Sequence, residues 1–75
     1  MRTEEAAEFV VCLRNEGFET SLLRRKLYRV LPDATAESEA LIRVVDETGE
    51  DYLYPRDRFG RVTVTRETAE ALSTA

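Results

Sequence analysis

The sequence contains no histidine and no tryptophan, and Cys12 is its one cysteine among 75 residues. Histidine is the usual general base and a common metal ligand, so its absence leaves little material for acid–base catalysis or metal binding. A lone cysteine excludes an intramolecular disulfide and a cysteine-based metal site. Without a histidine to activate it, Cys12 is expected to be a small apolar residue of the core.

Long apolar segments are also missing. No run of 18 apolar residues occurs, and the polar start Met1–Glu5 is not followed by the apolar part of a signal peptide. We therefore expect a cytoplasmic protein without membrane contact. The 11 basic and 15 acidic residues are interspersed and leave a net charge of −4, which argues against general attraction to nucleic acid.

The chain length limits what the protein can do. Seventy-five residues make one domain near the lower size limit for a stable core, which leaves little room for a deep catalytic pocket. The apolar fraction of 43% is ordinary for a globular protein. We expect no enzymatic activity and no cofactor.

The segment Leu41–Pro55 has the pattern of a β-hairpin, with two β-branched and aromatic runs around an acidic turn. Asp46 suits the first position of a type I turn, and Gly49 suits the fourth, where a positive φ forms a bulge. A tighter turn on Thr48 and Gly49 would force a β-branched residue to positive φ. It would also set like charges opposite each other. The sequence therefore predicts the three-residue loop.

This loop length sets the register of the hairpin. Val44 then faces Tyr52, and Ile42 faces Tyr54, with all four side chains on one side. The opposite side is mixed and carries Arg43, Val45, Asp51 and Leu53. Because the first side is apolar and aromatic, it is either part of the core or a contact surface.

Three more runs have β-strand character: Phe9–Leu13, Lys26–Leu31 and Arg61–Thr65. The segment Phe18–Arg25 fits a long loop that tucks Leu22 inward, and it fits a helical turn equally well.

Short helical turns are expected in the connections. Asp33 or Thr35 can cap a weak helix after the second strand. Pro55–Gly60 is typical of a single 3₁₀ turn that returns Phe59 to the core, and Thr65 can cap a helical tail.

The layout of five short strands, a long early loop and a late 3₁₀ turn predicts a mainly β protein, a small, partly open SH3-like barrel. Residues 9–65 form this barrel. Residues 1–8 are expected to be a helical turn or a flexible end, and residues 66–75 a short helical or frayed tail.

The run Lys26–Asp33 and the segment Leu41–Phe59 carry a resemblance that agrees with this layout. They resemble small uncharacterised bacterial proteins of SH3-like type, whose recurring pattern is a YRVLPD strand followed by an IRVVDETGEDYLYP hairpin and a later phenylalanine. The resemblance covers about residues 9–65 and implies the barrel fold without implying an activity.

Tyr54, Pro55 and Phe59 are also similar to the proline-bearing 3₁₀ turn of signalling SH3 domains. This chain departs from them because it has no tryptophan, and Arg58 stands where those domains usually carry a ligand-stacking tyrosine. The departure weakens any expectation that an aromatic groove recognises a polyproline peptide.

The acidic residues of the hairpin give no catalytic or metal site. Glu50 and Asp51 are neighbours on a strand, so they point to opposite faces and are expected to form a solvated hairpin tip. Together with Asp46 and Glu47 they match no EF-hand spacing, and we expect no metal site.

Tyrosines and arginines remain as candidates for binding. Three tyrosines are more than a minimal core needs, and a tyrosine whose hydroxyl reaches solvent is common at interfaces. The sequence predicts contact with another protein through Tyr28, Tyr52, Tyr54, Arg56 and Arg58. The alternative is a nucleic-acid or nucleoprotein accessory factor that uses the basic residues Arg24, Arg25, Lys26 and Arg29. A monomer or a weak homodimer is expected.

Overall fold

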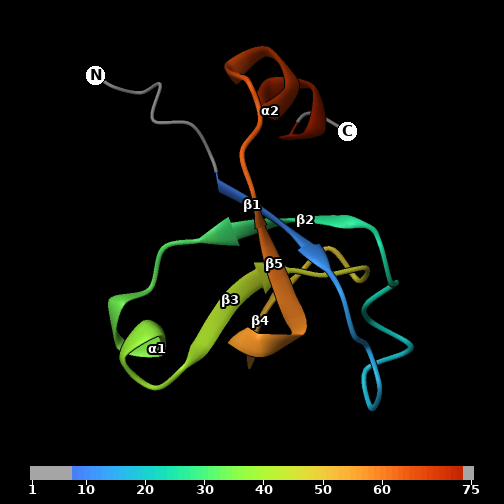
Figure 1. Ribbon diagram of the computed structural model, residues 1–75, viewed down its shortest axis with the longest axis vertical. Helices are drawn as coiled ribbons and strands as arrows, with labels where there is room; N and C mark the ends of the chain where they lie inside the picture. Colours follow the sequence, from blue (N-terminus) through green and yellow to red (C-terminus); the bar gives the residue numbers. More distant parts are fainter. Residues whose placement is uncertain (1–7, 74–75) are drawn as a thin grey trace.

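The computed structural model describes residues 8–73, which form five antiparallel strands and two short α-helices (Figure 1). The strands are β1 (Glu8–Cys12), β2 (Leu27–Leu31), β3 (Leu41–Val45), β4 (Asp51–Pro55) and β5 (Phe59–Val62). The connections contain α1 (Ala34–Ser38) after β2, the 3₁₀ turn η1 (Arg56–Arg58) after β4, and α2 (Arg66–Ser73) after β5. The helical turn expected near the N-terminus falls outside the described residues, except that Glu8 belongs to β1.

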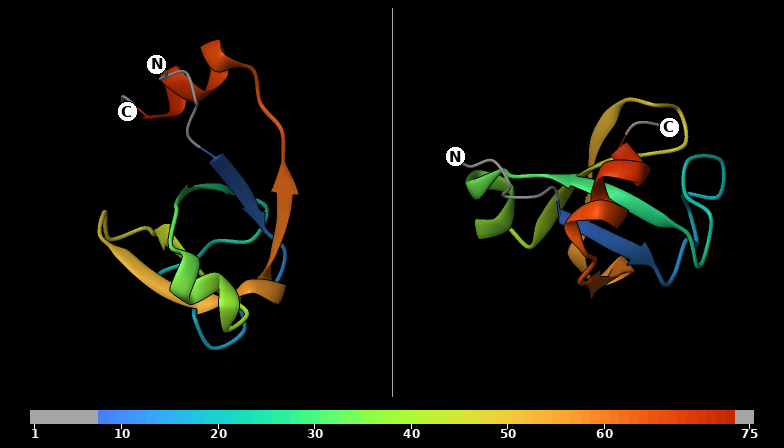
Figure 2. Two further views of the ribbon diagram at one scale, coloured as in Figure 1. Left: turned by 90° about the vertical axis from the view of Figure 1, so that its left-hand side faces the viewer. Right: turned by 90° about the horizontal axis from the view of Figure 1, so that it is seen from above.

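The strands form one sheet in the order β4-β3-β2-β1-β5, with every neighbouring pair antiparallel. Figure 2 shows this sheet curving around a shared interior. The predicted mainly β class is therefore confirmed. Within residues 8–73 no ladder joins β4 to β5, so the strand pairing shows an open sheet with two edges rather than a closed barrel.

The hairpin has the predicted turn and register. Gly49 has a φ of +86° and its N–H donates to the C=O of Asp46 at 3.0 Å. The N–H of Asp46 donates to the C=O of Glu50 at 3.0 Å, which closes the three-residue loop with its bulge. Val44 pairs with Tyr52, as the loop length requires.

The core lies on the concave side of the sheet. Its buried members are Val10, Cys12, Leu22, Tyr28, Val30, Val44 and Tyr54. Leu22 comes from the loop between β1 and β2 and is fully buried, in agreement with one of the two interpretations that the sequence left open for this segment. Its N–H donates to the C=O of Phe18 at 2.9 Å, so this loop contains a helical turn as well as the inward tuck.

The strand bounds differ from the sequence-based expectations by one residue in β1 and β2 and by more in β5. The last strand begins at Phe59, two residues before the predicted start at Arg61, because Phe59 leaves η1 in an extended conformation and pairs at once with Cys12. It ends at Val62, after which Thr65 caps α2 by accepting a hydrogen bond from the N–H of Thr68 at 3.1 Å.

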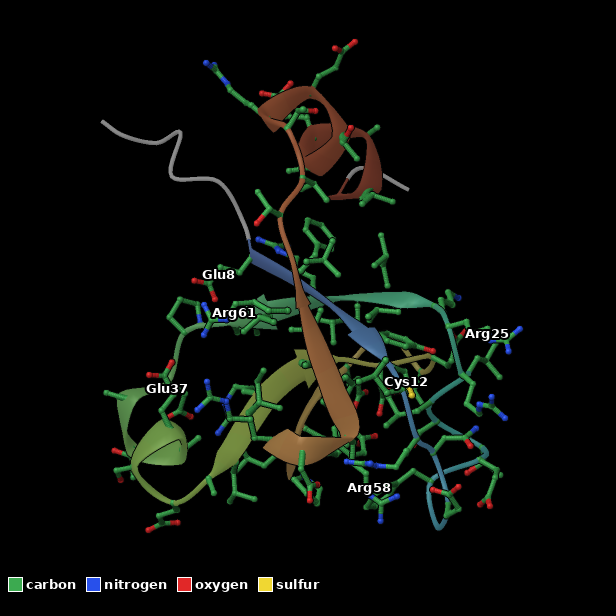
Figure 3. The ribbon with its side chains drawn as sticks, viewed as in Figure 1. Glu8, Cys12, Arg25, Glu37, Arg58 and Arg61 are labelled. Atoms are coloured by element: carbon green, nitrogen blue, oxygen red, sulfur yellow. The ribbon has the colours of Figure 1, made fainter. Side chains whose placement is uncertain are left out.

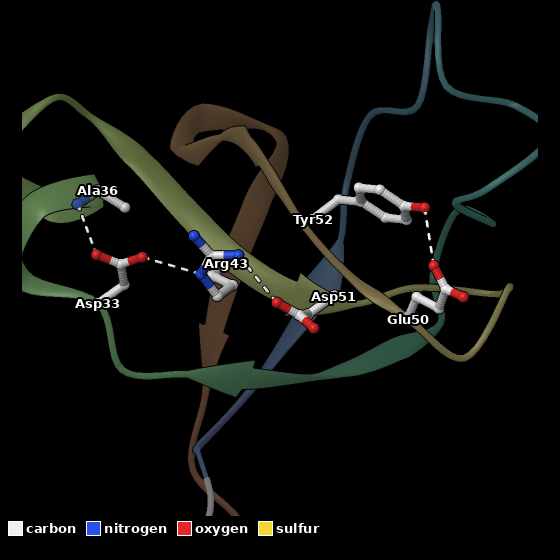
Figure 4. Close-up of polar contacts among 6 residues, drawn as sticks. All are labelled: Asp33, Ala36, Arg43, Glu50, Asp51 and Tyr52. Atoms are coloured by element: carbon white, nitrogen blue, oxygen red, sulfur yellow. Dashed lines mark hydrogen bonds and ion pairs between the residues drawn. The ribbon is translucent and has the colours of Figure 1, made fainter.

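Asp33, and not Thr35, caps α1. Its carboxylate accepts a hydrogen bond from the N–H of Ala36 at 3.0 Å, which satisfies one of the free donors at the start of the helix. The same carboxylate contacts Arg43 on β3, and Arg43 also contacts Asp51 on β4, each at 2.9 Å (Figure 4). These contacts connect α1 to the β3–β4 hairpin on the face of the hairpin that points away from the core.

Candidate partner-binding surface

The structure separates the three tyrosines. Tyr28 and Tyr54 are 4% and 5% exposed, whereas Tyr52 is 49% exposed. The hydroxyl of Tyr52 contacts Glu50 on the surface, at 3.0 Å (Figure 4). Tyr52 therefore remains available for contact with a partner, while the other two rings belong to the core.

Tyr54 is held in the core by polar and aromatic contacts. Its hydroxyl donates to Oδ2 of Asp46 at 2.6 Å and lies 2.8 Å from Oγ of Ser21. Its ring packs edge-on against Phe18, with centroids 5.0 Å apart, and against Phe59 at 6.2 Å. Burial, followed by the hydrogen bond to Asp46, raises the pKa of Tyr54. The ring thus links β4 to the loop between β1 and β2.

Tyr28 makes a second link of this kind. Its hydroxyl donates to Oε2 of Glu47 at 2.6 Å and accepts a hydrogen bond from the N–H of Leu23 at 2.8 Å. Nζ of Lys26 also lies 2.6 Å from Oε2 of Glu47. The N–H of Glu47 donates to the C=O of Ser21 at 3.0 Å, so the hairpin turn is bonded to the loop through main chain and side chains.

The acidic hairpin turn is therefore only partly solvated. Glu50 and Asp51 are exposed, as expected, but Asp46 is 6% exposed, which the sequence did not indicate. Burial raises the pKa of Asp46, and hydrogen bonds from Thr48 and Tyr54 outweigh it and leave that pKa below the ordinary value. The contacts from Lys26 and Tyr28 lower the pKa of Glu47. Both carboxylates serve as structural acceptors.

The candidate arginines lie in different surroundings. Arg58 contacts Glu16 at 3.1 Å, and its guanidinium lies 5.2 Å from the centre of the Phe18 ring. These contacts connect η1 to the loop between β1 and β2, the first loop. Arg56 is exposed and forms no ion pair with the described residues. The structure thus leaves Arg56 as the freer of the two for contact with another molecule.

The alternative basic patch is smaller than the sequence suggested, because Lys26 is engaged by Glu47. Arg24, Arg25 and Arg29 are exposed, and none forms an ion pair within residues 8–73. Arg25 has a φ of +70° and is held there by a hydrogen bond of 2.7 Å from its N–H to the C=O of Cys12.

A groove of about 540 Å³ opens beside β5. Its floor consists of Val10, Val30, Ile42 and Phe59, which also belong to the core or pack against it. The walls include the remaining residues of β5, together with residues of the other elements that line the groove: Glu8, Glu37, Leu41 and Arg56. Sequence reasoning missed this groove, since its walls come together only when the sheet curves.

Four charged side chains stand around the groove: Glu8, Glu37, Arg56 and Arg61. Figure 3 shows Glu8, Arg61 and Glu37 on the same side of the molecule. None of the four forms an ion pair with the described residues. Of these residues, only Arg56 belongs to the partner-binding surface predicted from the sequence.

Comparisons with protein-family models, with curated proteins and with solved structures found no match to this chain. No helix within residues 8–73 is long and apolar enough to cross a membrane. The same described residues contain no group of three or more cysteine, aspartate or glutamate side chains placed to hold a metal ion.

Proposed function

We propose that this protein is a small non-enzymatic binding module that contacts another protein, and that its open sheet is a partly open barrel of the SH3-like kind. The strand order, the long loop between β1 and β2, and the 3₁₀ turn between β4 and β5 support the barrel.

The groove beside β5 carries the functional part of the proposal. An apolar floor surrounded by charged groups is typical of a protein-binding site, in which a desolvated centre lies within a polar rim. The charged side chains at the rim form no ion pair with the described residues. A binding protein that brings an opposite charge therefore does not compete with an internal ion pair.

Several other polar side chains have internal structural partners. Asp46 and Glu47 are structural acceptors for tyrosine hydroxyls, and Arg43 is shared between two carboxylates. Of the residues that the sequence predicts for partner binding, Arg56 lines the groove and Tyr52 is the exposed tyrosine.

Site-specific photo-crosslinking tests this proposal in an extract of the native host. A photoreactive phenylalanine analogue is placed at Arg56, at Tyr52, or at Glu67 on α2 as a matched exposed control. We expect discrete protein adducts from Arg56 and none from Glu67. Adducts from Tyr52 alone would move the contact to the hairpin.

Two outcomes would contradict the proposal. Equal labelling at Arg56 and Glu67 would mean that the groove has no preferred protein partner. Nucleic-acid adducts from the same analogue at Arg25, with none from Arg56, would favour the accessory-factor alternative, whose affinity should fall steeply with added salt.

A further inference from the structure

The backbone of β1 shows which groups of β5 are free. The N–H of Cys12 donates to the C=O of Lys26 at 3.0 Å, and the C=O of Cys12 accepts from the N–H of Arg25 at 2.7 Å. Cys12 therefore directs both of its backbone groups toward β2. The next residue, Leu13, turns the other way, since its N–H donates to the C=O of Arg58 at 2.8 Å.

This direction alternates along an antiparallel strand, so Val11 and Phe9 also point toward β5. Their partners in the register are Gly60 and Val62, which are therefore the residues of β5 bonded to β1. Arg61 lies between them, and its N–H and C=O point to the outer edge. Within residues 8–73, β5 is the last strand of the sheet on this side, so no described strand occupies that edge and it can pair with an added strand.

The side chain of Arg61 lies on the core side of the sheet. Arg61 is opposite Val10, whose side chain is buried in the core, and opposed residues of a ladder project to the same face. Glu8 shares that face because it is two residues from Val10 and opposite Val30. The free edge, the apolar floor and charges of both signs thus meet in one groove.

Resting on the proposed function, we infer that the partner inserts an extended peptide segment that pairs with the free edge of β5 as an additional strand. The backbone of Arg61 recognises this segment, and an apolar side chain of the segment packs on the floor. An acidic residue of the segment faces Arg56 or Arg61, and a basic residue faces Glu8 or Glu37. This is recognition by strand addition.

A second copy of this chain fits the edge less well. Antiparallel pairing of two β5 strands centred on Arg61 would set two guanidiniums opposite each other, and such like-charge pairs are destabilising. The groove instead presents two carboxylates and two guanidiniums. A peptide segment with one acidic and one basic side chain on either side of an apolar residue complements these charges and the apolar floor.

Nuclear magnetic resonance of the full chain with synthetic peptides tests this inference. The probes are acetyl-Thr-Glu-Thr-Val-Thr-Lys-Thr-amide, in which glutamate, valine and lysine project to one face of an extended strand, and the peptide with glutamate and lysine exchanged. We expect one order to shift the groove residues and to slow hydrogen exchange of the Arg61 amide about tenfold at saturation, as a new hydrogen bond would. The amide of Val62, which already faces β1, is the matched control and should change little.

Two variants separate backbone pairing from simple charge attraction. Methylating the backbone nitrogen of the valine should remove binding, because strand addition needs that N–H as a donor to the C=O of Arg61. The Arg61→Glu substitution should weaken binding of the preferred peptide about tenfold, equivalent to 1.4 kcal/mol. Replacing the peptide glutamate with lysine should restore binding to that variant.

The outcomes distinguish this inference from the proposed function. If Arg56 crosslinks to a protein while neither peptide slows Arg61 exchange, or while methylated peptides bind equally well, strand addition is wrong and the binding function stands. If slowing depends on protein concentration without any peptide, the occupant is a second copy and the inference is overturned. If crosslinking and peptide binding both fail, both proposals are wrong.

Discussion

Replacing Tyr54 with phenylalanine tests the buried link between the hairpin and the first loop. The ring and its edge-on contact with Phe18 remain, but the hydroxyl that donates to Asp46 at 2.6 Å is lost. Asp46 is 6% exposed, so water does not readily replace that donor. Hydrogen bonds to charged groups contribute about 1.5–3 kcal/mol, so we expect Tyr54→Phe to lower the free energy of unfolding by about 2 kcal/mol.

This loss is large for so small a domain. With about 4–8 °C of Tm per kcal/mol for 60–100 residues, the expected decrease in Tm is roughly 8–16 °C. Urea unfolding followed by far-UV circular dichroism should show a lower midpoint with an unchanged slope. Tyr52→Phe is the matched control, because its hydroxyl contacts Glu50 on the surface, and we expect no measurable change.

The pH dependence gives an independent check. Folding lowers the pKa of Asp46, so this carboxylate stabilises the fold above its unfolded pKa of about 4 and loses that contribution as the pH falls through the folded pKa. Tyr54→Phe removes one of the hydrogen bonds that lower the pKa. The difference in stability between wild type and variant should be full at pH 7 and shrink below about pH 4.

Two results would refute this reasoning. Equal stability of Tyr54→Phe and Tyr52→Phe at pH 7 would show that the hydrogen bond to Asp46 contributes nothing net. A stability difference that stays constant down to pH 3 would show that the ionised carboxylate is not involved.

Three further predictions concern the turn, the cap and the cysteine. Gly49→Val should lower the stability by about 1–2 kcal/mol, because a β-branched residue is strained at a φ of +86°, and an unchanged urea midpoint would contradict the turn. Asp33→Ala should lower the Tm more than Asp33→Asn, since asparagine can still accept the N–H of Ala36; equal losses would show that the charge contact with Arg43 dominates. Cys12 is fully buried and burial raises the pKa of its thiol, so a disulfide reagent should label it only as fast as the protein opens, and immediate labelling of the native protein would argue against this core position.

The sequence by itself determined the local structure of the hairpin. The type I turn with Gly49 at its end follows from turn chemistry, and the pairing of Val44 with Tyr52 follows from the loop length. These interactions involve residues close along the chain, so the pattern contains what is needed to predict them. The inward position of Leu22 was one of two interpretations that the sequence left open, and the structure shows it together with a helical turn.

Burial of the tyrosines was decided by the tertiary structure. Alternation puts Tyr52 and Tyr54 on one face of β4, and nothing in the pattern tells which of them lies under other elements. The first loop covers Tyr54, and its Ser21 lies within hydrogen-bond distance of the Tyr54 hydroxyl. Asp46, which accepts the Tyr54 hydroxyl, is also buried, although an acidic turn is typical of a solvated surface.

The groove is the feature that the sequence pattern indicated least. Glu8, Glu37, Arg56 and Arg61 come from four elements and share no sequence motif. The pairing of β5 with β1 and the curvature of the sheet bring them around one apolar floor. Contacts between residues distant in sequence depend on how complete elements pack, and local periodicity carries no information about that packing.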